Sequence, residues 1–135
     1  MKLKRVEHVA VAVHDMQASM KMLEETLGLE LDYEERIGDT RLAMYPVGET
    51  SIELLQAEGP ASQVNEWIEG NGQSIYHLCF EVDDIDAALA ELKEKGVKLI
   101  DETPRTGHGG SRIAFLDPAS TGNIVIELAE LPPGH

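Results

Sequence analysis

Two histidines and two glutamates could together bind one divalent metal ion. His8 and Glu53 lie in the first half of the chain, and His77 and Glu127 lie at matching places in the second half. Imidazole and carboxylate groups are ligands for zinc, manganese, iron, cobalt or nickel, and two of each leave a formal charge near zero once a divalent ion binds. The residue types and their matched places therefore predict four metal ligands.

The matched places come from an internal repeat. Each half contains one histidine-bearing and one glutamate-bearing segment of similar sequence: VEHVAVAVHDM (6–16) and IYHLCFEVDDI (75–85), SIELLQA (51–57) and VIELAEL (125–131). Residues 1–135 are therefore expected to form a single domain of two modules, at about 5–58 and 75–131. The linker between them, residues 59–74, is expected to contain a short helix near residues 63–69.

Each module is predicted to have the element order βαβββ. Asp15 and Asp84 stand where helix N-caps belong, apolar residues follow at helical spacing, and Gly28 and Gly96 end the helices. The expected strands are 6–13, 30–36, 41–47 and 50–57, then 76–82, 98–102, 112–116 and 124–130. The fold class is therefore α+β, with two tandem βαβββ modules forming one curved mixed sheet and helices on its convex side.

The alternation of side chains along a strand places the four candidate ligands on equivalent faces. His8 lies opposite Val9, and His77 lies opposite Leu78. Glu127 lies on the strand face opposite Ile126, and Glu53 likewise lies on the face opposite its apolar neighbours. Because the bulky apolar faces should meet the helices, the other faces can line a shared concave surface.

Composition narrows the classes of function. The chain of 135 residues has a net charge of −14, which argues against nucleic acid as a partner, since a nucleic-acid binder presents a basic face. No apolar run is long enough to cross a membrane. Cys79 is the single cysteine, so no intrachain disulfide can form. These features favour a cytoplasmic protein.

The segments VEHVAVAV, SIELL and GHGGSRIAFLDPASTGNIVIEL resemble the vicinal oxygen chelate superfamily, which includes glyoxalases, bleomycin resistance proteins and dioxygenases. Within it, nearly the whole chain is most similar to the methylmalonyl-CoA epimerase family. The resemblance implies that His8, Glu53, His77 and Glu127 hold one divalent metal ion per chain. It implies a cobalt-like ion, with zinc, manganese or nickel as alternatives, and a homodimer.

The same resemblance implies an isomerase that interconverts (R)- and (S)-methylmalonyl-CoA by proton abstraction, through a metal-stabilised enolate. Its partner would be a small acyl-CoA substrate. Glu127 is the expected catalytic base, and its repeat mate Glu53 is the candidate for the second base. Some family members carry a further glutamate in the third strand, where this chain has Arg41, Leu42 and Ala43. The identity of the second acid or base therefore stays open.

Other features leave alternatives. Asp117 and Ala119 stand where epimerases often have other residues, which leaves the exact acyl-CoA substrate open. A glyoxalase I-type lactoylglutathione lyase would use the same ligand set, and a metal-free small-molecule-binding resistance protein would share the fold. The loop TGHGGS (106–111), which contains His108, is interpreted either as a substrate-facing lid or as a plain connector.

Overall fold

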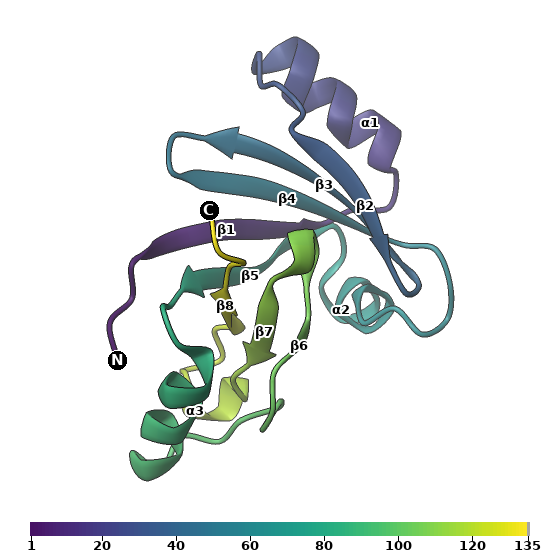
Figure 1. Ribbon diagram of the computed structural model, residues 1–135. Coiled ribbons are helices and arrows are strands. Elements are labelled where there is room, and N and C mark those ends of the chain that lie inside the picture. The colour runs from purple at the N-terminus through teal and green to yellow at the C-terminus, as the bar shows by residue number, and fades with distance from the viewer. Residues whose placement is uncertain (135) are drawn as a thin grey trace. The chain divides into compact units, whose positions relative to one another are not determined.

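The computed structural model describes residues 1–134, and its elements follow the repeated order that the sequence predicts (Figure 1). The first half contains β1 (Arg5–Ala12), α1 (Met16–Lys21), η1 (Met22–Thr26), β2 (Tyr33–Ile37), β3 (Thr40–Val47), β4 (Thr50–Ala57) and α2 (Val64–Asn71). The second half contains β5 (Ser74–Glu81), α3 (Ile85–Glu94), β6 (Arg105–Thr106), η2 (His108–Gly110), β7 (Arg112–Phe115), η3 (Pro118–Ser120) and β8 (Ile126–Glu130). The α+β class and the doubled βαβββ order are confirmed.

The chain forms two compact units. One unit is His8–Tyr76, and the other combines residues 1–7 with the chain from His77 onward. The boundary therefore falls inside β1, directly before His8, and inside β5, directly before His77. Each unit contains one of the two candidate histidines and the glutamate that follows it in the repeat.

In the unit His8–Tyr76 the strand order is β2-β3-β4-β1, with β1 and β4 parallel and the other neighbours antiparallel. Met16 and Met20 of α1 pack on one sheet face with Ala43, Tyr45 and Leu54. Because a strand alternates its side chains, the opposite face carries a second apolar cluster, which α2 covers. That cluster contains Ala10, Ala12, Leu42, Met44, Leu55 and Val64.

Tyr45 connects this sheet to the segment that follows α1. Its hydroxyl donates a hydrogen bond of 2.6 Å to Glu24 of η1, and its side chain is completely buried. Burial raises the pKa of Tyr45 above its ordinary value, and the bond to Glu24 raises it further. The tyrosine is therefore a neutral donor that fixes this turn of helix to β3.

In the other unit the strand order is β5-β8-β7-β6, with β5 and β8 parallel. Helix α3 packs on one face, as Figure 1 shows, through Ile85, Leu89 and Leu92 against apolar residues that include Ala114 and Leu128. The opposite face carries Cys79, Ile113, Phe115 and Ala129. The two units thus repeat the arrangement of a helix behind a mixed four-stranded sheet.

One predicted strand is wrong. Residues 98–102 were expected to form a strand, but they form the isolated bridge between Leu99 and Leu116 and a few backbone hydrogen bonds with residues 115 and 117 rather than a ladder. The carboxylate of Asp101 accepts a hydrogen bond from the backbone N–H of Phe115 at 2.9 Å, which takes a donor that a ladder would use. Pro104 follows and has no backbone N–H to donate. The paired strand is therefore the short β6, further along the chain.

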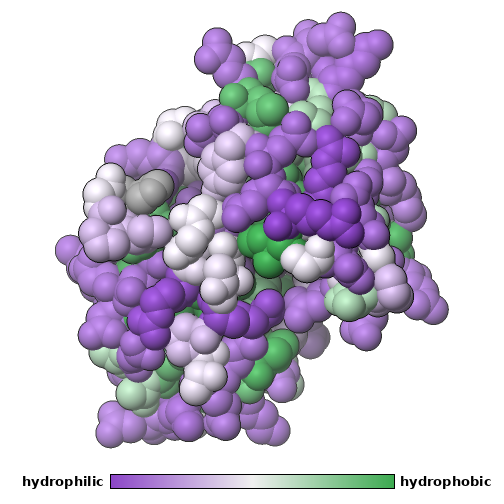
Figure 2. Space-filling view, turned by 45° about the vertical axis from the view of Figure 1, so that its right-hand side comes forward, coloured by the Kyte–Doolittle hydropathy of each residue, from purple (hydrophilic) through white to green (hydrophobic). Residues whose placement is uncertain are grey.

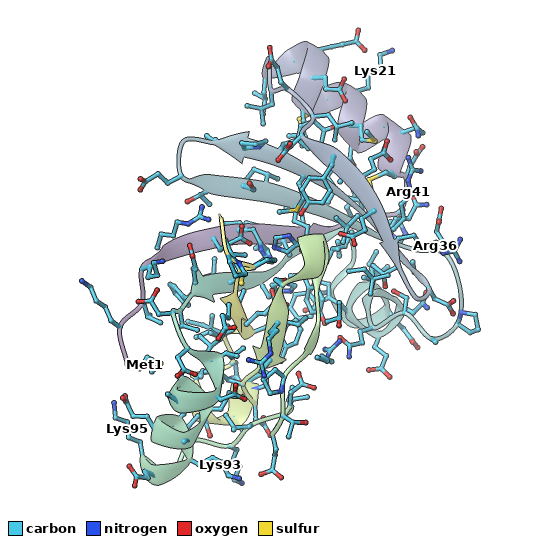
Figure 3. The ribbon with its side chains drawn as sticks, in the orientation of Figure 1. Met1, Lys21, Arg36, Arg41, Lys93 and Lys95 are labelled. Atoms are coloured by element: carbon cyan, nitrogen blue, oxygen red, sulfur yellow. The ribbon has the colours of Figure 1, made fainter. Side chains whose placement is uncertain are left out.

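The face in Figure 2 is mainly hydrophilic, with small separated hydrophobic areas. Two lysines labelled in Figure 3 lie beside carboxylates: Lys95 is 2.9 Å from Glu91, and Lys93 is 3.3 Å from Glu102. Among residues 1–134, no helix is long and apolar enough to cross a membrane.

The aspartate caps give a test of the fold. Asp84 accepts a hydrogen bond from the backbone N–H of Ala87 at 3.0 Å, at the start of α3. Replacing Asp84 with Ala is expected to lower the free energy of unfolding by about 1 kcal/mol, because one N–H of the first turn loses its acceptor. Urea denaturation measures this change. Asp84→Asn should restore most of the loss, and Glu94→Ala, an exposed change on the same helix, should cost less than Asp84→Ala.

Candidate functional site

His8 and Glu53 form a buried pair in the unit His8–Tyr76. The Nε2 atom of His8 lies 3.2 Å from Oε1 of Glu53, and the two residues are 1% and 4% exposed. They come from the neighbouring parallel strands β1 and β4, where Ala10, two residues after His8, is the register partner of Glu53. The stagger of two residues lets the imidazole and the carboxylate meet on one sheet face.

His77 and Glu127 form the same pair in the other unit. Their Nε2 and Oε1 atoms are also 3.2 Å apart, and the residues are 5% and 4% exposed. Here Cys79, two residues after His77, is the register partner of Glu127 on the parallel strands β5 and β8. The internal repeat therefore extends to strand direction, register and side-chain contact.

The chemistry of each pair fits a shared metal ion. Two ligand atoms that each lie about 2.1 Å from one ion are roughly 3.0 to 3.4 Å apart in octahedral or tetrahedral geometry. The separation of 3.2 Å within each pair falls in that range. Burying imidazole and carboxylate groups costs free energy unless they are paired or bind a metal. Each unit thus supplies one nitrogen and one oxygen donor.

An aromatic residue and a cation lie beside the second pair. The ring of Phe115 meets the ring of His77 edge-on, with centroids 5.0 Å apart, and Phe115 is the register partner of Glu127 on β7. The guanidinium of Arg105 lies over the ring of Phe115, 5.4 Å from its centroid, and donates a hydrogen bond to Asp101. Phe115 therefore contacts both the imidazole of His77 and the guanidinium of Arg105.

Strand β3, in the unit His8–Tyr76, contains no acidic residue. Leu42 is 3% exposed and Ala43 is completely buried, both within apolar clusters, while Arg41 bonds to Glu34. Asp117 does not replace such a group, because its carboxylate accepts a hydrogen bond from the backbone N–H of Ala119 and caps a turn. Where this chain departs from the epimerase pattern, Leu42 and Ala43 thus pack in the core and Asp117 caps a turn.

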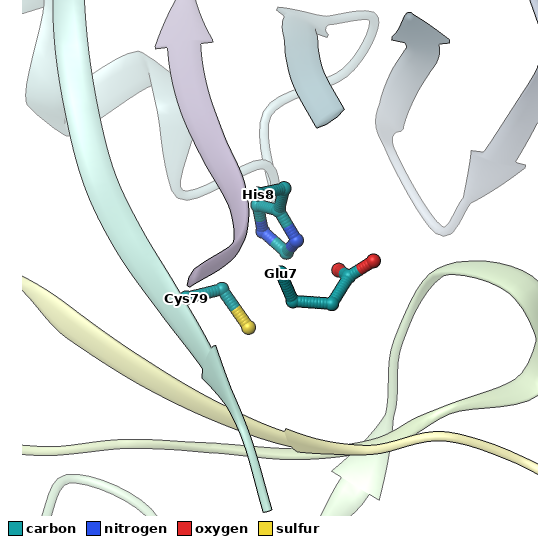
Figure 4. A group of neighbouring side chains, drawn as sticks. All are labelled: Glu7, His8 and Cys79. Atoms are coloured by element: carbon teal, nitrogen blue, oxygen red, sulfur yellow. The ribbon is translucent and has the colours of Figure 1, made fainter. Parts of the chain in front are cut away.

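A third histidine–carboxylate contact was not predicted. His108, on the loop before β7, places Nε2 2.7 Å from Oε1 of Glu7, and the two residues are 7% and 5% exposed. Figure 4 draws Glu7 with Cys79 of the same unit and with His8, the next residue along β1. The signal in the sequence was a second ionisable residue, Glu7, directly before His8 in the first strand, which has no obvious partner until the loop folds against it.

Comparisons with known proteins show the family of the chain. Residues 7–115 match the model of the Glyoxalase/Bleomycin resistance protein/Dioxygenase superfamily. The ethylmalonyl-CoA/methylmalonyl-CoA epimerase of Cereibacter sphaeroides is 33% identical over 94% of this chain and 98% of its own length.

Solved structures give the same result. The methylmalonyl-CoA epimerase of Mycobacterium tuberculosis is 31% identical, with a TM-score of 0.93 over 97% of this chain and 90% of that chain. A variant of the Streptomyces coelicolor methylmalonyl-CoA epimerase in complex with 2-nitronate-propionyl-CoA is also 31% identical. Its TM-score is 0.93, over 98% of this chain and 97% of that chain.

Proposed function

We propose that this chain, which belongs to the glyoxalase/bleomycin resistance protein/dioxygenase superfamily, is a metal-dependent epimerase that interconverts (R)- and (S)-methylmalonyl-CoA. The observation that carries the proposal is the pair of buried His–Glu contacts at repeat-related places, each with a separation of 3.2 Å. Relatives that are themselves methylmalonyl-CoA epimerases, about 30% identical over nearly the whole chain, support the choice of reaction and substrate.

His8, Glu53, His77 and Glu127 would hold one divalent ion, which is expected to be cobalt-like, with zinc, manganese or nickel as alternatives. When bound, such an ion would act as a Lewis acid for the negative charge that develops on the substrate oxygens. The donor set of two imidazoles and two carboxylates suits these transition metals better than calcium or magnesium, which prefer oxygen ligands throughout.

Glu127 is the proposed base for the hydrogen on the carbon between the thioester and the carboxylate. That hydrogen is acidic because the neighbouring thioester carbonyl accepts the electron pair of the broken C–H bond. Glu127 is 4% exposed and lies beside His77, so its carboxylate is held in one place rather than moving in water. Glu53 is the repeat-related candidate for the second base. The carbon is inverted when a proton returns from the opposite side.

The test follows the α-proton. Each pure epimer of methylmalonyl-CoA is incubated in D2O with protein supplied with cobalt, and proton NMR measures deuterium at the α-carbon as the other epimer forms. We expect both processes, and we expect EDTA to abolish them and added cobalt to restore them. A metal-loaded protein that converts neither epimer contradicts the proposal. Turnover of a glutathione hemithioacetal instead would assign the protein to lactoylglutathione lyases.

A further inference from the structure

The contact between Glu7 and His108 is a buried ion-pair geometry that the mechanism above does not use. The two residues are 101 positions apart in the sequence, and their Oε1 and Nε2 atoms are 2.7 Å apart. Arg5 Nη2 lies 3.9 Å from the second carboxylate oxygen of Glu7. A buried imidazole and carboxylate cost free energy unless each has a partner, so the pair fixes the position of His108.

The loop that carries His108 has a conformation that depends on its glycines. A Cβ atom on Gly107 would lie 2.6 Å from Cγ2 of Ile113 and 2.9 Å from Oγ of Ser111, so only glycine fits there. Gly109 and Gly110 have φ angles of 61° and 77°, which side chains rarely allow. The backbone also closes on itself, since Ser111 N–H donates to the carbonyl of His108 at 3.0 Å. His108 therefore sits on a glycine-dependent turn that packs against Ile113.

This loop lies on the sheet face that carries His77 and Glu127. Ile113 and Cys79 belong to one apolar cluster on that face, opposite α3. Cys79 is the register partner of Glu127, and its sulfur lies within 4.8 Å of a carboxylate oxygen of Glu7. Cys79 therefore neighbours both Glu7 and Glu127 on this face.

A buried hydroxyl next to His108 points to a polar ligand. Ser111 is 1% exposed, and within residues 1–134 its Oγ has no hydrogen-bond partner. Leaving such a group unsatisfied costs about 1 to 3 kcal/mol, so an oxygen-rich molecule bound beside it would recover free energy. The Oγ atom is directed toward Gly107, on the loop that carries His108.

We propose that His108, oriented by Glu7, takes the place of Glu53 as the second proton-transfer residue of the epimerisation. The inference rests on the proposed function and supplies the second acid that β3 does not offer. Glu127 takes the α-proton, and the electron pair of the C–H bond moves into the thioester carbonyl. Protonated His108 then gives a ring proton to the opposite side of the carbon, where the electron pair forms the new C–H bond. Glu127 ends protonated and His108 neutral, and proton exchange with water resets both.

The two-residue scheme predicts an asymmetry that a structural role for His108 would not produce. In D2O, each epimer presents its α-proton to only one of the two residues. His108→Gln is expected to lower epimerisation in both directions by about 100-fold or more, the usual span for loss of an acid or base. The epimer that faces Glu127 should still exchange its α-proton at a rate within about 10-fold of the wild type, while exchange from the other epimer falls with epimerisation.

Two further variants make the test secure. His14→Gln alters an exposed histidine whose backbone, rather than its ring, bonds to Gln73, and it should behave as wild type. Glu7→Gln keeps an oxygen acceptor for His108 and should show the same asymmetry with a smaller loss, and it carries the test if His108→Gln does not fold.

Equal loss of exchange from both epimers in folded, metal-loaded His108→Gln overturns the assignment of His108, and so does unchanged epimerisation. If the wild-type protein exchanges neither epimer, the proposed function itself is wrong. These outcomes separate the failure of the His108 assignment from the failure of the epimerase proposal.

Discussion

Replacing Glu127 with Gln is expected to lower epimerase turnover by about 100-fold or more while the protein still binds its metal. Glutamine has the size of glutamate and keeps an oxygen that can act as a ligand, but it cannot accept the α-proton. Glu127 is buried, and its Oε1 lies 3.2 Å from Nε2 of His77, so the substitution should leave the surrounding sheet unchanged. The initial rate of epimerisation by NMR and the metal content by mass spectrometry measure the two effects separately.

Glu53→Gln is the matched control, because the repeat gives Glu53 the same type of strand, register and histidine partner. If Glu127 is the base, Glu53→Gln should lose less activity at saturating metal. Full epimerase activity in metal-loaded Glu127→Gln protein would rule out the base assignment, and the proton acceptor would then be sought at Glu53. Equal losses in the two variants would mean that the carboxylates share the role.

The sequence predicts the paired strands well because the repeat constrains them twice. The alternation of apolar and polar residues assigns His8 and His77 to the face away from the helices, and the glutamates follow by the same alternation. Alternation alone does not show which residues are paired across neighbouring strands. The strand register shows that Ala10 and Cys79, not the histidines, are the partners of the glutamates. The stagger is a property of two strands together, so it becomes visible only in the structure.

The features that were missed depend on contacts between distant residues. The N-caps Asp15 and Asp84 were predicted because a cap acts within three residues of itself. The strand at 98–102 was wrong because Asp101 takes a backbone donor from β7, a contact that no local pattern contains. The Glu7–His108 bond joins residues 101 positions apart, so composition and periodicity gave no reason to join them.

Replacing His8 or His77 with Ala is expected to weaken metal binding first and to lower activity as a consequence. Loss of a residue that only supports a ligand typically costs 10- to 100-fold in metal affinity, so loss of a ligand should cost about 100-fold or more. Because the two histidines have equivalent strands, registers and separations from their glutamates, the two losses should be similar in size. Competition with a chromogenic chelator measures the affinity for cobalt or zinc.

Activity measured against metal concentration distinguishes these variants from Glu127→Gln. His8→Ala and His77→Ala should regain part of their activity as metal is raised, because occupancy limits them, whereas Glu127→Gln should stay slow at every metal concentration. His14→Ala is the control, since His14 is exposed and outside the proposed ligand set. Wild-type affinity in both His8→Ala and His77→Ala would show that the two pairs do not bind the ion. A loss confined to one of them would place the metal at a single pair and leave the other to bind substrate or transfer protons.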